Sequence, residues 1–318
     1  MKRKRRKIRR SVLVIGLLVI AAVVCAVLLS LKNSLQKEDS AVITGSVMDT
    51  KEKGTLIMEA QALYARQQED LEELISAYLE QNNISEDSVQ YCIEDLETNE
   101  RYVHNETENV TAASIYKLPL AMIYYEKIAA GELDENTLFT YEANHYESGG
   151  PIGTTYAPGA QIPLEELLHC MILYSDNTAG HILYENLDGW VGFKKAITKY
   201  SEDEQEDYFF SYDNVLNASF IGDVLNYLYA HEDIFATLLE DMKKATPNDY
   251  LASSIQPEIA QKWGLYSVYR NAAGIVYGEH PYSIAIFTSL NEDGIRVIGE
   301  INELCYEYFN GYEWTKEE

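Results

Sequence analysis

Ser114 and Lys117 form a Ser-x-x-Lys pattern at the start of the apolar run LPLAMIYYEKI. At positions i and i+3 of a helix the two side chains share one face. A helix amino terminus offers unpaired N–H groups and the positive end of the dipole, which suits a hydroxyl that must become an alkoxide. A lysine kept neutral by burial could take the proton of that hydroxyl. The pattern therefore predicts a nucleophilic serine with a lysine base.

The same pattern has a plainer interpretation. A small residue often caps a helix, and a lysine one turn later is usually exposed. Ser34-Leu35-Gln36-Lys37 also fits the pattern, in a polar stretch where we expect no active site. The Ser-x-x-Lys pattern therefore needs support from other parts of the chain.

Two further polar groups lie in apolar surroundings. Ser175-Asp176-Asn177 follows the run LLHCMILY, so its side chains need hydrogen-bond partners in the folded protein. Either they cap a new helix, or Ser175 relays a proton while Asn177 holds an amide. Lys262-Trp263-Gly264 lies within a predicted strand, where a cation followed by glycine can hold a carboxylate near the backbone. The alternative is a lysine that protects an edge strand from aggregation.

The elements that must position these groups follow from periodicity and turn signals. In chain order we expect a helix over 57–81, a hairpin of strands 88–95 and 101–104, a helix over 113–130 ended by Gly131, a mostly helical region over 132–250, strands over 258–269, 272–277 and 282–289, and a closing helix over 295–309. This order predicts a mixed α/β (α+β) fold, in which both chain ends build one sheet and a helical subdomain lies between them.

The amino-terminal segment differs from the rest. Eight of the 25 Lys and Arg residues lie in the first ten positions, and residues 11–31 carry no charge. As a helix that segment is about 31 Å long, enough to cross the hydrocarbon core, and the basic run before it predicts a cytoplasmic amino terminus. We expect a cytoplasmic tail (1–10), a transmembrane signal anchor (11–31), a linker (32–56) and an extracellular domain (57–318). A cleaved signal peptide, usually with a shorter apolar region, is the alternative.

The remainder of the chain is strongly acidic. Lys32 is the ninth basic residue, so the chain from Asn33 on carries 16 basic residues (25 − 9) and 51 acidic ones, a net charge of −35 (16 − 51). That charge repels phosphate backbones, and we expect no nucleic-acid partner. Cys92, Cys170 and Cys305 form no C-x-x-C pair, and the six histidines lack metal-binding spacing. We therefore expect buried free thiols, no metal and no cofactor.

Taken in this order, S-x-x-K, S-D-N and Lys-Trp-Gly resemble the signature set of the serine β-lactamase and penicillin-binding protein superfamily, class A branch. The segments YCIEDLETNERYVHN and NAAGIVYGEHPYSIAIFT are also similar to family segments, and their order agrees. The resemblance covers about residues 57–312. It implies a β-lactamase-like fold, with an antiparallel five-stranded sheet flanked by helices and an all-helical subdomain.

The resemblance implies catalytic roles for the residues that match its motifs. Ser114 would be the acylating nucleophile, and Lys117 would be its base or part of its proton network. Ser175, supported by Lys262, would shuttle a proton toward the leaving nitrogen. No metal or organic cofactor is required for this chemistry.

Substrate-binding groups are implied in the same way. Asn177 would bind the side-chain amide of the substrate, and Lys262 would face its carboxylate. Gly264 would let that carboxylate approach the backbone. The backbone N–H groups of Ser114 and Leu265 would form the oxyanion hole, in which one donor typically contributes about 10²–10³ in rate.

The sequence departs from the family pattern at two places. Trp263 stands where the family usually has Thr or Ser, so a hydroxyl is lost and a bulky ring enters. The loop that supplies the deacylating glutamate is also altered: only Asp213-Asn214-Val215-Leu216-Asn217 has the frame, with Asp in place of Glu. Its shorter side chain puts its reach toward a water in doubt, and Asp213 as a turn or capping residue is the alternative.

These departures separate acylation from turnover, because hydrolysis of the ester needs a base that activates water. Three functions follow. The first is a membrane-anchored serine hydrolase acting on β-lactams or D-Ala-D-Ala-type cell-wall peptides, with weak or no turnover of β-lactams. The second is a penicillin-binding sensor or trap, and the third is an idle module that binds the cell wall. Arg270, near the end of the Lys262 strand, is a further candidate for binding a carboxylate.

Overall fold

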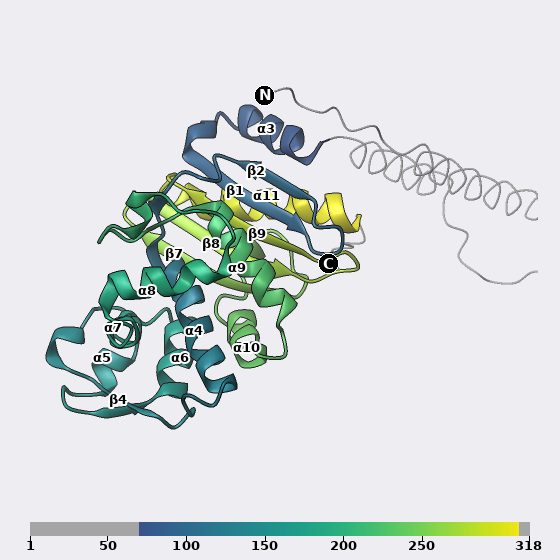
Figure 1. Ribbon diagram of the computed structural model, residues 1–318. Helices are drawn as coiled ribbons and strands as arrows, with labels where there is room; N and C mark the ends of the chain where they lie inside the picture. The colour runs from purple at the N-terminus through teal and green to yellow at the C-terminus, as the bar shows by residue number, and fades with distance from the viewer. Residues whose placement is uncertain (1–69, 312–318) are drawn as a thin grey trace, which may run out of the picture. The chain divides into compact units, whose positions relative to one another are not determined.

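The computed structural model describes residues 70–311, whose centre is an antiparallel sheet with strand order β2-β1-β9-β8-β7 (Figure 1). The strands are β1 (Val89–Asp95), β2 (Arg101–His104), β7 (Ile259–Tyr266), β8 (Tyr269–Val276) and β9 (Tyr282–Thr288). β1 pairs with β9 from Val89↔Thr288 to Asp95↔Tyr282, so segments from the two ends of the domain meet at the centre of the sheet. The predicted fold class is confirmed.

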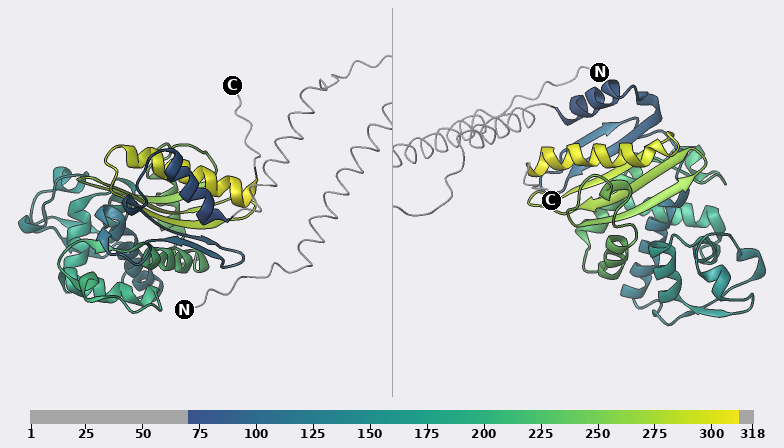
Figure 2. Two further views of the ribbon diagram at one scale, coloured as in Figure 1. Left: turned by 90° about the horizontal axis from the view of Figure 1, so that it is seen from above. Right: turned by 180° about the vertical axis from the view of Figure 1, so that it is seen from behind.

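Helices cover both faces of this sheet (Figure 2). On one face lie α3 (Leu71–Gln81) and α11 (Asp293–Asn310), and on the other lies α9 (Ala218–Ala230). The apolar positions of α11 recur at helical spacing, and Val297, Ile298, Ile301 and Cys305 are buried against the sheet. The expected segments 1–10, 11–31 and 32–56, and residues 57–69 of the first predicted helix, lie outside the described residues.

A helical subdomain lies between the early and late strands, as predicted. Its central helix is α4 (Lys117–Ala129), in which every residue from Lys117 to Tyr125 is buried. The surrounding elements are α5 (Ile152–Thr155), α6 (Leu164–Leu173), α7 (Asn177–Glu185), α8 (Gly189–Ile197), α10 (Ala236–Lys244), and the short strand pairs β3 (Val110–Thr111) with β6 (Val215–Leu216) and β4 (Leu138–Thr140) with β5 (Gln161–Pro163). A helix buried on all sides fixes the side chains at its start inside the protein.

The predicted strand over 258–269 is too long. β7 ends at Tyr266, and a turn with Ser267 at φ 51° leads into β8 at Tyr269. This turn contains no Gly, Pro or Asn, so the usual turn signals were missing and the break could not be located from the sequence.

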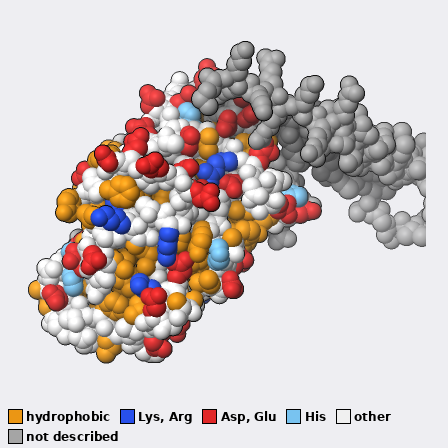
Figure 3. Space-filling view, viewed as in Figure 1, with side chains coloured by type: hydrophobic (Ala, Val, Ile, Leu, Met, Phe, Trp, Pro, Cys, Tyr) orange, Lys and Arg blue, Asp and Glu red, His pale blue; other side chains and the backbone are white. Residues whose placement is uncertain are grey.

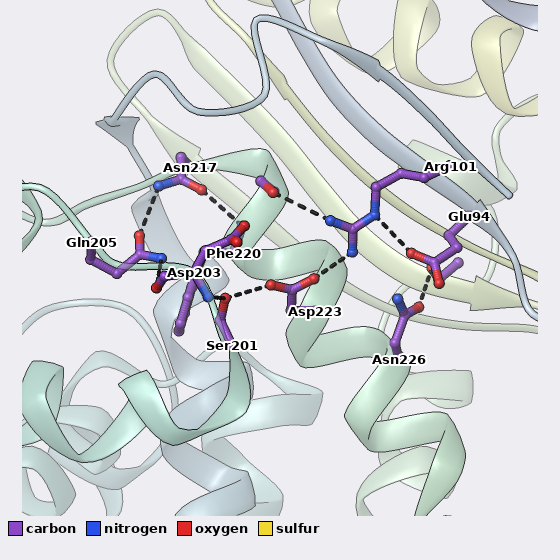
Figure 4. Close-up of polar contacts among 11 residues, drawn as sticks. Glu94, Arg101, Ser201, Asp203, Gln205, Asn217, Phe220, Asp223 and Asn226 are labelled. Atoms are coloured by element: carbon purple, nitrogen blue, oxygen red, sulfur yellow. Dashed lines mark hydrogen bonds and ion pairs between the residues drawn. The ribbon is translucent and has the colours of Figure 1, made fainter. Parts of the chain in front are cut away.

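Arg101 on β2 connects the first hairpin to α9 (Figure 4). Its Nε donates to Glu94 Oε2 at 2.8 Å, and its guanidinium pairs with Asp223 on α9. The other oxygen of Asp223 accepts from Ser201 Oγ at 2.5 Å. From there hydrogen bonds continue through the loop before β6, by way of Asp203, Gln205 and Asn217 (Figure 4). The hairpin, α9 and this loop are therefore held together by one polar network.

Replacing Arg101 by Met should lower the free energy of unfolding by about 2 kcal/mol, because Glu94 and Asp223 would lose their cation in a partly buried position. Urea denaturation of the full chain measures this change. Lys127→Met is the matched control, since the Lys127–Glu132 pair is more exposed and should contribute below about 0.5 kcal/mol. Equal losses in the two variants would contradict the prediction.

Candidate active site

Ser114 lies in a short 3₁₀ turn, Ala113–Tyr116, which joins β3 to α4. The residue before it, Ala113, has φ 50°, a left-handed conformation that costs a non-glycine residue energy and recurs at functional sites. Two contacts with Asn214 hold this turn: Asn214 Nδ2 donates to Ala113 O at 2.8 Å, and Ala112 N donates to Asn214 O at 2.9 Å. The position of Ser114 is therefore fixed by the loop that precedes β6.

Lys117 is the first residue of α4 and is fully buried. Its Nζ lies 3.1 Å from Ser114 Oγ, 2.6 Å from Asn177 Oδ1 and 2.6 Å from the Ser175 carbonyl oxygen. Burial lowers the pKa of Lys117 to about 7, against the opposing effect of the carboxylates of Asp176 and Glu147. A substantial fraction of the amine is therefore neutral at pH 7 and able to accept the proton of Ser114.

Ser175 lies between two lysines. Its Oγ is 3.3 Å from Lys117 Nζ and 3.0 Å from Lys262 Nζ, and its backbone has φ 56°. Burial, and then the positive charge of Lys117, hold the pKa of Lys262 well below its usual value. The hydroxyl of Ser175 can therefore exchange protons with an amine on either side.

Asp176 and Asn177 support the loop opposite Ser114. The buried carboxylate of Asp176 accepts from Ala179 N at 2.8 Å, as the cap of α7, and from Ile152 N at 2.7 Å. Asn177 Nδ2 donates to Ser148 O at 2.6 Å. In this motif the capping function belongs to Asp176, which leaves Ser175 and Asn177 to face Lys117.

β7 forms the wall next to Ser114. It is the edge strand of the sheet, so alternate backbone N–H groups on its outer side have no neighbouring strand to pair with. A Cβ atom on Gly264 would lie 3.0 Å from Ala112 O and 3.1 Å from Ser114 N. Glycine at this position therefore allows β7 to approach the nucleophile, with Leu265 as the next residue of the strand.

These residues surround a cavity of about 910 Å³. Ser114, Ser175, Asn177 and Leu265 line it, whereas Lys117, Lys262 and Gly264 lie behind its wall. The structure thus brings together all of the site residues expected from the sequence: Ser114, Lys117, Ser175, Asn177, Lys262, Gly264 and Leu265. The cavity is large enough for a small peptide or a bicyclic lactam.

Trp263 was expected to place a bulky ring in the site. Its ring instead packs against Tyr250, with ring centroids 5.7 Å apart, and is partly buried, although Trp263 also contributes to the cavity wall. Its Nε1 has no hydrogen-bond partner among the described residues. Trp263 therefore both stacks on Tyr250 and forms part of the cavity wall, with its ring centroid 4.9 Å from Lys262 Nζ.

Asp213 and Asn217 do not act on one site. Asp213 lines the cavity in a turn in which Val215 N donates to Asp213 O at 2.9 Å. Asn217 is buried and caps α9, where its Oδ1 accepts from Phe220 N at 2.8 Å. Of the five-residue frame seen in the sequence, Asp213 therefore lines the cavity, whereas Asn217 does not.

The hypothesis that Arg270 binds a substrate carboxylate is wrong. Its guanidinium donates to the carbonyl oxygens of Ser267 and Tyr269, both at 2.9 Å, and pairs with Glu292. Arg270 is buried and is not among the residues that line the cavity. It stabilises the β7–β8 turn.

Lys194 on α8 is a structural residue that the sequence reasoning missed. It is fully buried, and its Nζ donates to the carbonyl oxygens of Asp213 at 2.8 Å and Val215 at 3.2 Å, and to that of Phe209. Burial lowers its pKa to about 8, against the opposing effect of Asp213. The signal was a lysine on the apolar stripe of α8, one turn after Trp190 and one turn before Ile197.

Cys92, Cys170 and Cys305 are free and buried, as the sequence predicted. Burial raises the pKa of Cys92 and of Cys170 to about 12, so neither thiol is activated as a nucleophile. Residues 70–311 contain no group of three or more His, Cys, Asp or Glu side chains placed to hold a metal ion. Among the helices of the same residues, none is long and apolar enough to cross a membrane.

The model of the β-lactamase enzyme family matches residues 68–309, which is more than half of the chain. The chain belongs to this family. The match begins just before α3 and ends within α11, so it contains the sheet, the helical subdomain and the cavity. The resemblance inferred from three short motifs is confirmed.

Two curated relatives match parts of the chain. A β-lactamase from Bacillus subtilis (strain 168) is 28% identical over 130 residues, 41% of this chain and 41% of that protein. The β-lactamase regulatory protein BlaB from Streptomyces cacaoi is 29% identical over 96 residues, 30% of this chain and 31% of that protein. The chain therefore spans less than half the length of the curated relatives it matches.

Solved structures are similar over most of the domain. A mutant of PBP-A, described as an acyl-enzyme complex with penicillin G, has a TM-score of 0.65 at 17% identity and covers 74% of this chain and 95% of its own. An ancestral class A β-lactamase (GNCA) has a TM-score of 0.65 at 18% identity and covers 76% and 100%. A β-lactamase from Xanthomonas campestris pv. campestris has a TM-score of 0.65 at 15% identity and covers 75% and 98%. These similarities establish the fold.

Gly264→Val should slow acylation of Ser114 by at least about tenfold, because the new side chain would meet Ala112 and Ser114 and push β7 away. Gly264→Ala should have a smaller effect, since its single Cβ needs shifts of only a few tenths of an ångström. Intact mass after timed exposure to an acylating β-lactam gives the rates, and circular dichroism checks that both variants fold. A valine variant that reacts at the wild-type rate would show that close approach of β7 is unnecessary.

Trp190 should report the protonation of Lys194. Its ring centroid is 5.5 Å from Lys194 Nζ, and its Nε1 donates to Asp213 O at 3.4 Å. Below pH 8 the ammonium can donate to all three carbonyl oxygens, whereas above pH 8 the neutral amine has two N–H donors and no charge. We expect the fluorescence of Trp190 to titrate with a midpoint near pH 8.

The chain contains three tryptophans, so Trp263→Phe with Trp314→Phe leaves Trp190 as the only emitter. Adding Lys194→Met to this background should abolish the transition near pH 8. A transition that persists in the methionine variant would assign it to another group, and a flat titration between pH 7 and 9 in the parent would contradict the depressed pKa of Lys194.

Proposed function

We propose that this protein is a serine hydrolase of the β-lactamase and penicillin-binding kind, which forms an ester between Ser114 and a β-lactam or a D-Ala-D-Ala-type cell-wall peptide. The observation that carries the proposal is the 3.1 Å separation of Ser114 Oγ and Lys117 Nζ, with burial lowering the pKa of the lysine to about 7. A base with a pKa close to the working pH is the most effective one for activating a hydroxyl.

Acylation would use the groups around the cavity in sequence. The neutral amine of Lys117 takes the proton of Ser114 as Oγ attacks the carbonyl carbon of the substrate. The negative oxygen that forms is stabilised by the backbone N–H groups of Ser114 and Leu265. As the C–N bond breaks, the hydroxyl of Ser175 donates its proton to the leaving nitrogen and is reprotonated by an adjacent ammonium, Lys117 or Lys262.

Hydrolysis of the ester would require a second base. The carboxylates that line the cavity in the described residues are Glu147 and Asp213. Glu147 Oε1 lies 2.9 Å from His181 Nδ1, and Asp213 lies in an exposed turn held by its carbonyl oxygen. Neither has the buried, hydrogen-bonded setting of Lys117. We therefore propose that acylation is efficient and that deacylation is slow.

A long-lived ester suits a second candidate function, a penicillin-binding sensor or trap. The specific observation is the altered deacylating loop, in which Asp213 lines the cavity but Asn217 caps α9. The relative from Streptomyces cacaoi is named a regulatory protein, which is consistent with a signalling role in this family. The acylation chemistry is the same in both candidates, and they differ in whether the adduct clears.

We further propose that residues 11–31 anchor the domain at the outer face of the cell membrane, with 1–10 in the cytoplasm and 32–56 as a linker. The support is the uncharged segment that follows eight basic residues. A serine enzyme in that place would meet cell-wall peptides and β-lactams directly.

Incubation of the full chain in detergent with benzylpenicillin should add the mass of one penicillin to the wild type and nothing to Ser114→Ala. Lys117→Met should acylate at least about 10²-fold more slowly, because its base is lost, and the wild-type rate should rise as pH increases through about 7. Intact mass spectrometry over hours measures the adduct, with Lys127→Met as a control of the same chemical change on the surface.

An adduct on Ser114→Ala, or none on the wild type, would contradict the proposal. An adduct that persists for hours supports the sensor or trap. An adduct that clears while penicilloate accumulates supports a hydrolase, and Asp213→Asn then asks whether Asp213 supplies the base.

A further inference from the structure

The mouth of the cavity is surrounded by exposed aromatic rings. Seven large apolar side chains are exposed among the described residues, and five of them line this one cavity: Tyr174, Tyr208, Tyr212, Leu265 and Tyr266. Tyr212 is 86% exposed and Tyr266 is 64% exposed. Large apolar groups gathered at one place usually mark a binding surface. We call the four tyrosines the tyrosine rim.

The tyrosine rim is built from separate parts of the chain. Tyr174 ends α6, Tyr208 and Tyr212 belong to the loop before β6, and Tyr266 ends β7. Lys194 holds that loop in place by donating to the carbonyl oxygens of Asp213 and Val215. The four rings therefore come from three separate segments of the chain.

The charged groups on the cavity wall are of one sign. In the part of the chain that the structure describes, Glu147 and Asp213 line the cavity and no Lys or Arg does. Lys117 and Lys262 are fully buried behind the wall, where Ser114, Ser175 and Asn177 occupy their donors. A ligand that extends from Ser114 toward the mouth would therefore meet aromatic faces and two carboxylates, Asp213 and Glu147, of which Glu147 also contacts His181 Nδ1 at 2.9 Å.

The wider surface of the protein also carries an excess of negative charge. The chain from Asn33 on carries 16 basic and 51 acidic residues, and acidic side chains predominate over basic ones on the face shown in Figure 3. Such a surface raises the local concentration of cations and repels anions. Tyrosine faces attract an ammonium group as well, through the negative charge of their π-electrons.

We propose that the tyrosine rim, with Glu147 and Asp213, forms a subsite that selects acyl substrates carrying an ammonium group on the side chain away from the scissile bond. The inference names a substrate class for the site of the proposed function and rests on that function. An exposed carboxylate and an exposed cation–π contact are each weak, so together they give a preference of about tenfold.

Three penicillins with a phenyl side chain test the charge alone. Ampicillin carries an ammonium group on the carbon next to the ring, benzylpenicillin carries no charge there, and carbenicillin carries a carboxylate. Calorimetric titration of the full-chain Ser114→Ala protein in detergent gives their dissociation constants without acylation. We expect ampicillin to bind most tightly and carbenicillin most weakly, about tenfold apart, with the gap narrowing in 0.5 M NaCl.

Matched variants distinguish the effect of the two carboxylates at the cavity from the effect of the protein's overall negative charge. Glu147→Gln with Asp213→Asn, added to Ser114→Ala, should bring the three dissociation constants within about twofold of one another. Glu132→Gln removes one negative charge from an exposed position that does not line the cavity, and should leave the order unchanged. Tyr212→Ser should weaken ampicillin more than benzylpenicillin.

Equal affinities, a reversed order, or no binding of any of the three penicillins would overturn the inference. Benzylpenicillin binding that depends on Tyr212 but not on charge would assign the rim to uncharged rings and would overturn it as well. The proposed function is tested by a different result: it is contradicted if the wild-type chain forms no adduct on Ser114. Binding to Ser114→Ala still decides the question of charge in that case.

Discussion

The site depends on two lysines buried around one serine hydroxyl. Lys117 and Lys262 both contact Ser175 Oγ, and neither makes an ion pair within 4.0 Å among the described residues. Removing an ammonium from water is costly, and a second one nearby adds repulsion, so both amines are pushed toward their neutral forms. These two are placed where their protons are easily given up.

The fold keeps the two lysines buried because each belongs to an element that is held by packing or by strand pairing. Lys117 begins a helix that is buried on all sides, and Lys262 lies on a strand that pairs along its length with β8. Asp176 contributes the nearest buried negative charge, but its oxygens are committed to the backbone N–H groups of Ala179 and Ile152. The carboxylate moderates the pKa of Lys117 without forming an ion pair that would fix its proton.

Part of the fold and part of the site could be predicted from the sequence, for physical reasons that differ between elements. The order of strands and helices followed from periodicity, and a sheet built from both chain ends followed from the positions of the longest predicted strands, although which strand pairs with which was not predicted. The Ser-x-x-Lys spacing placed Ser114 beside Lys117, since a helical turn fixes that geometry locally. The sequence did not show which distant residue each polar side chain contacts. Arg270, a candidate for binding a carboxylate, instead contacts the β7–β8 turn and Glu292, and Asn217, the last residue of the Asp213 frame, caps α9.

The two halves of the reaction depend on different parts of the chain. For acylation, Ser114 lies in the turn before α4, Lys117 begins α4, Ser175 lies between α6 and α7, and Lys262 lies on β7. Asp213, one of the two carboxylates that line the cavity, comes from the loop before β6, which Lys194 holds through the carbonyl oxygens of Phe209, Asp213 and Val215. These contacts use backbone atoms, so the path of the loop does not depend on the side chain of Asp213, whereas the side chain of Asn214 holds the turn before Ser114. A substitution at Asp213 can therefore change the carboxylate at the cavity while the contacts of Asn214 remain.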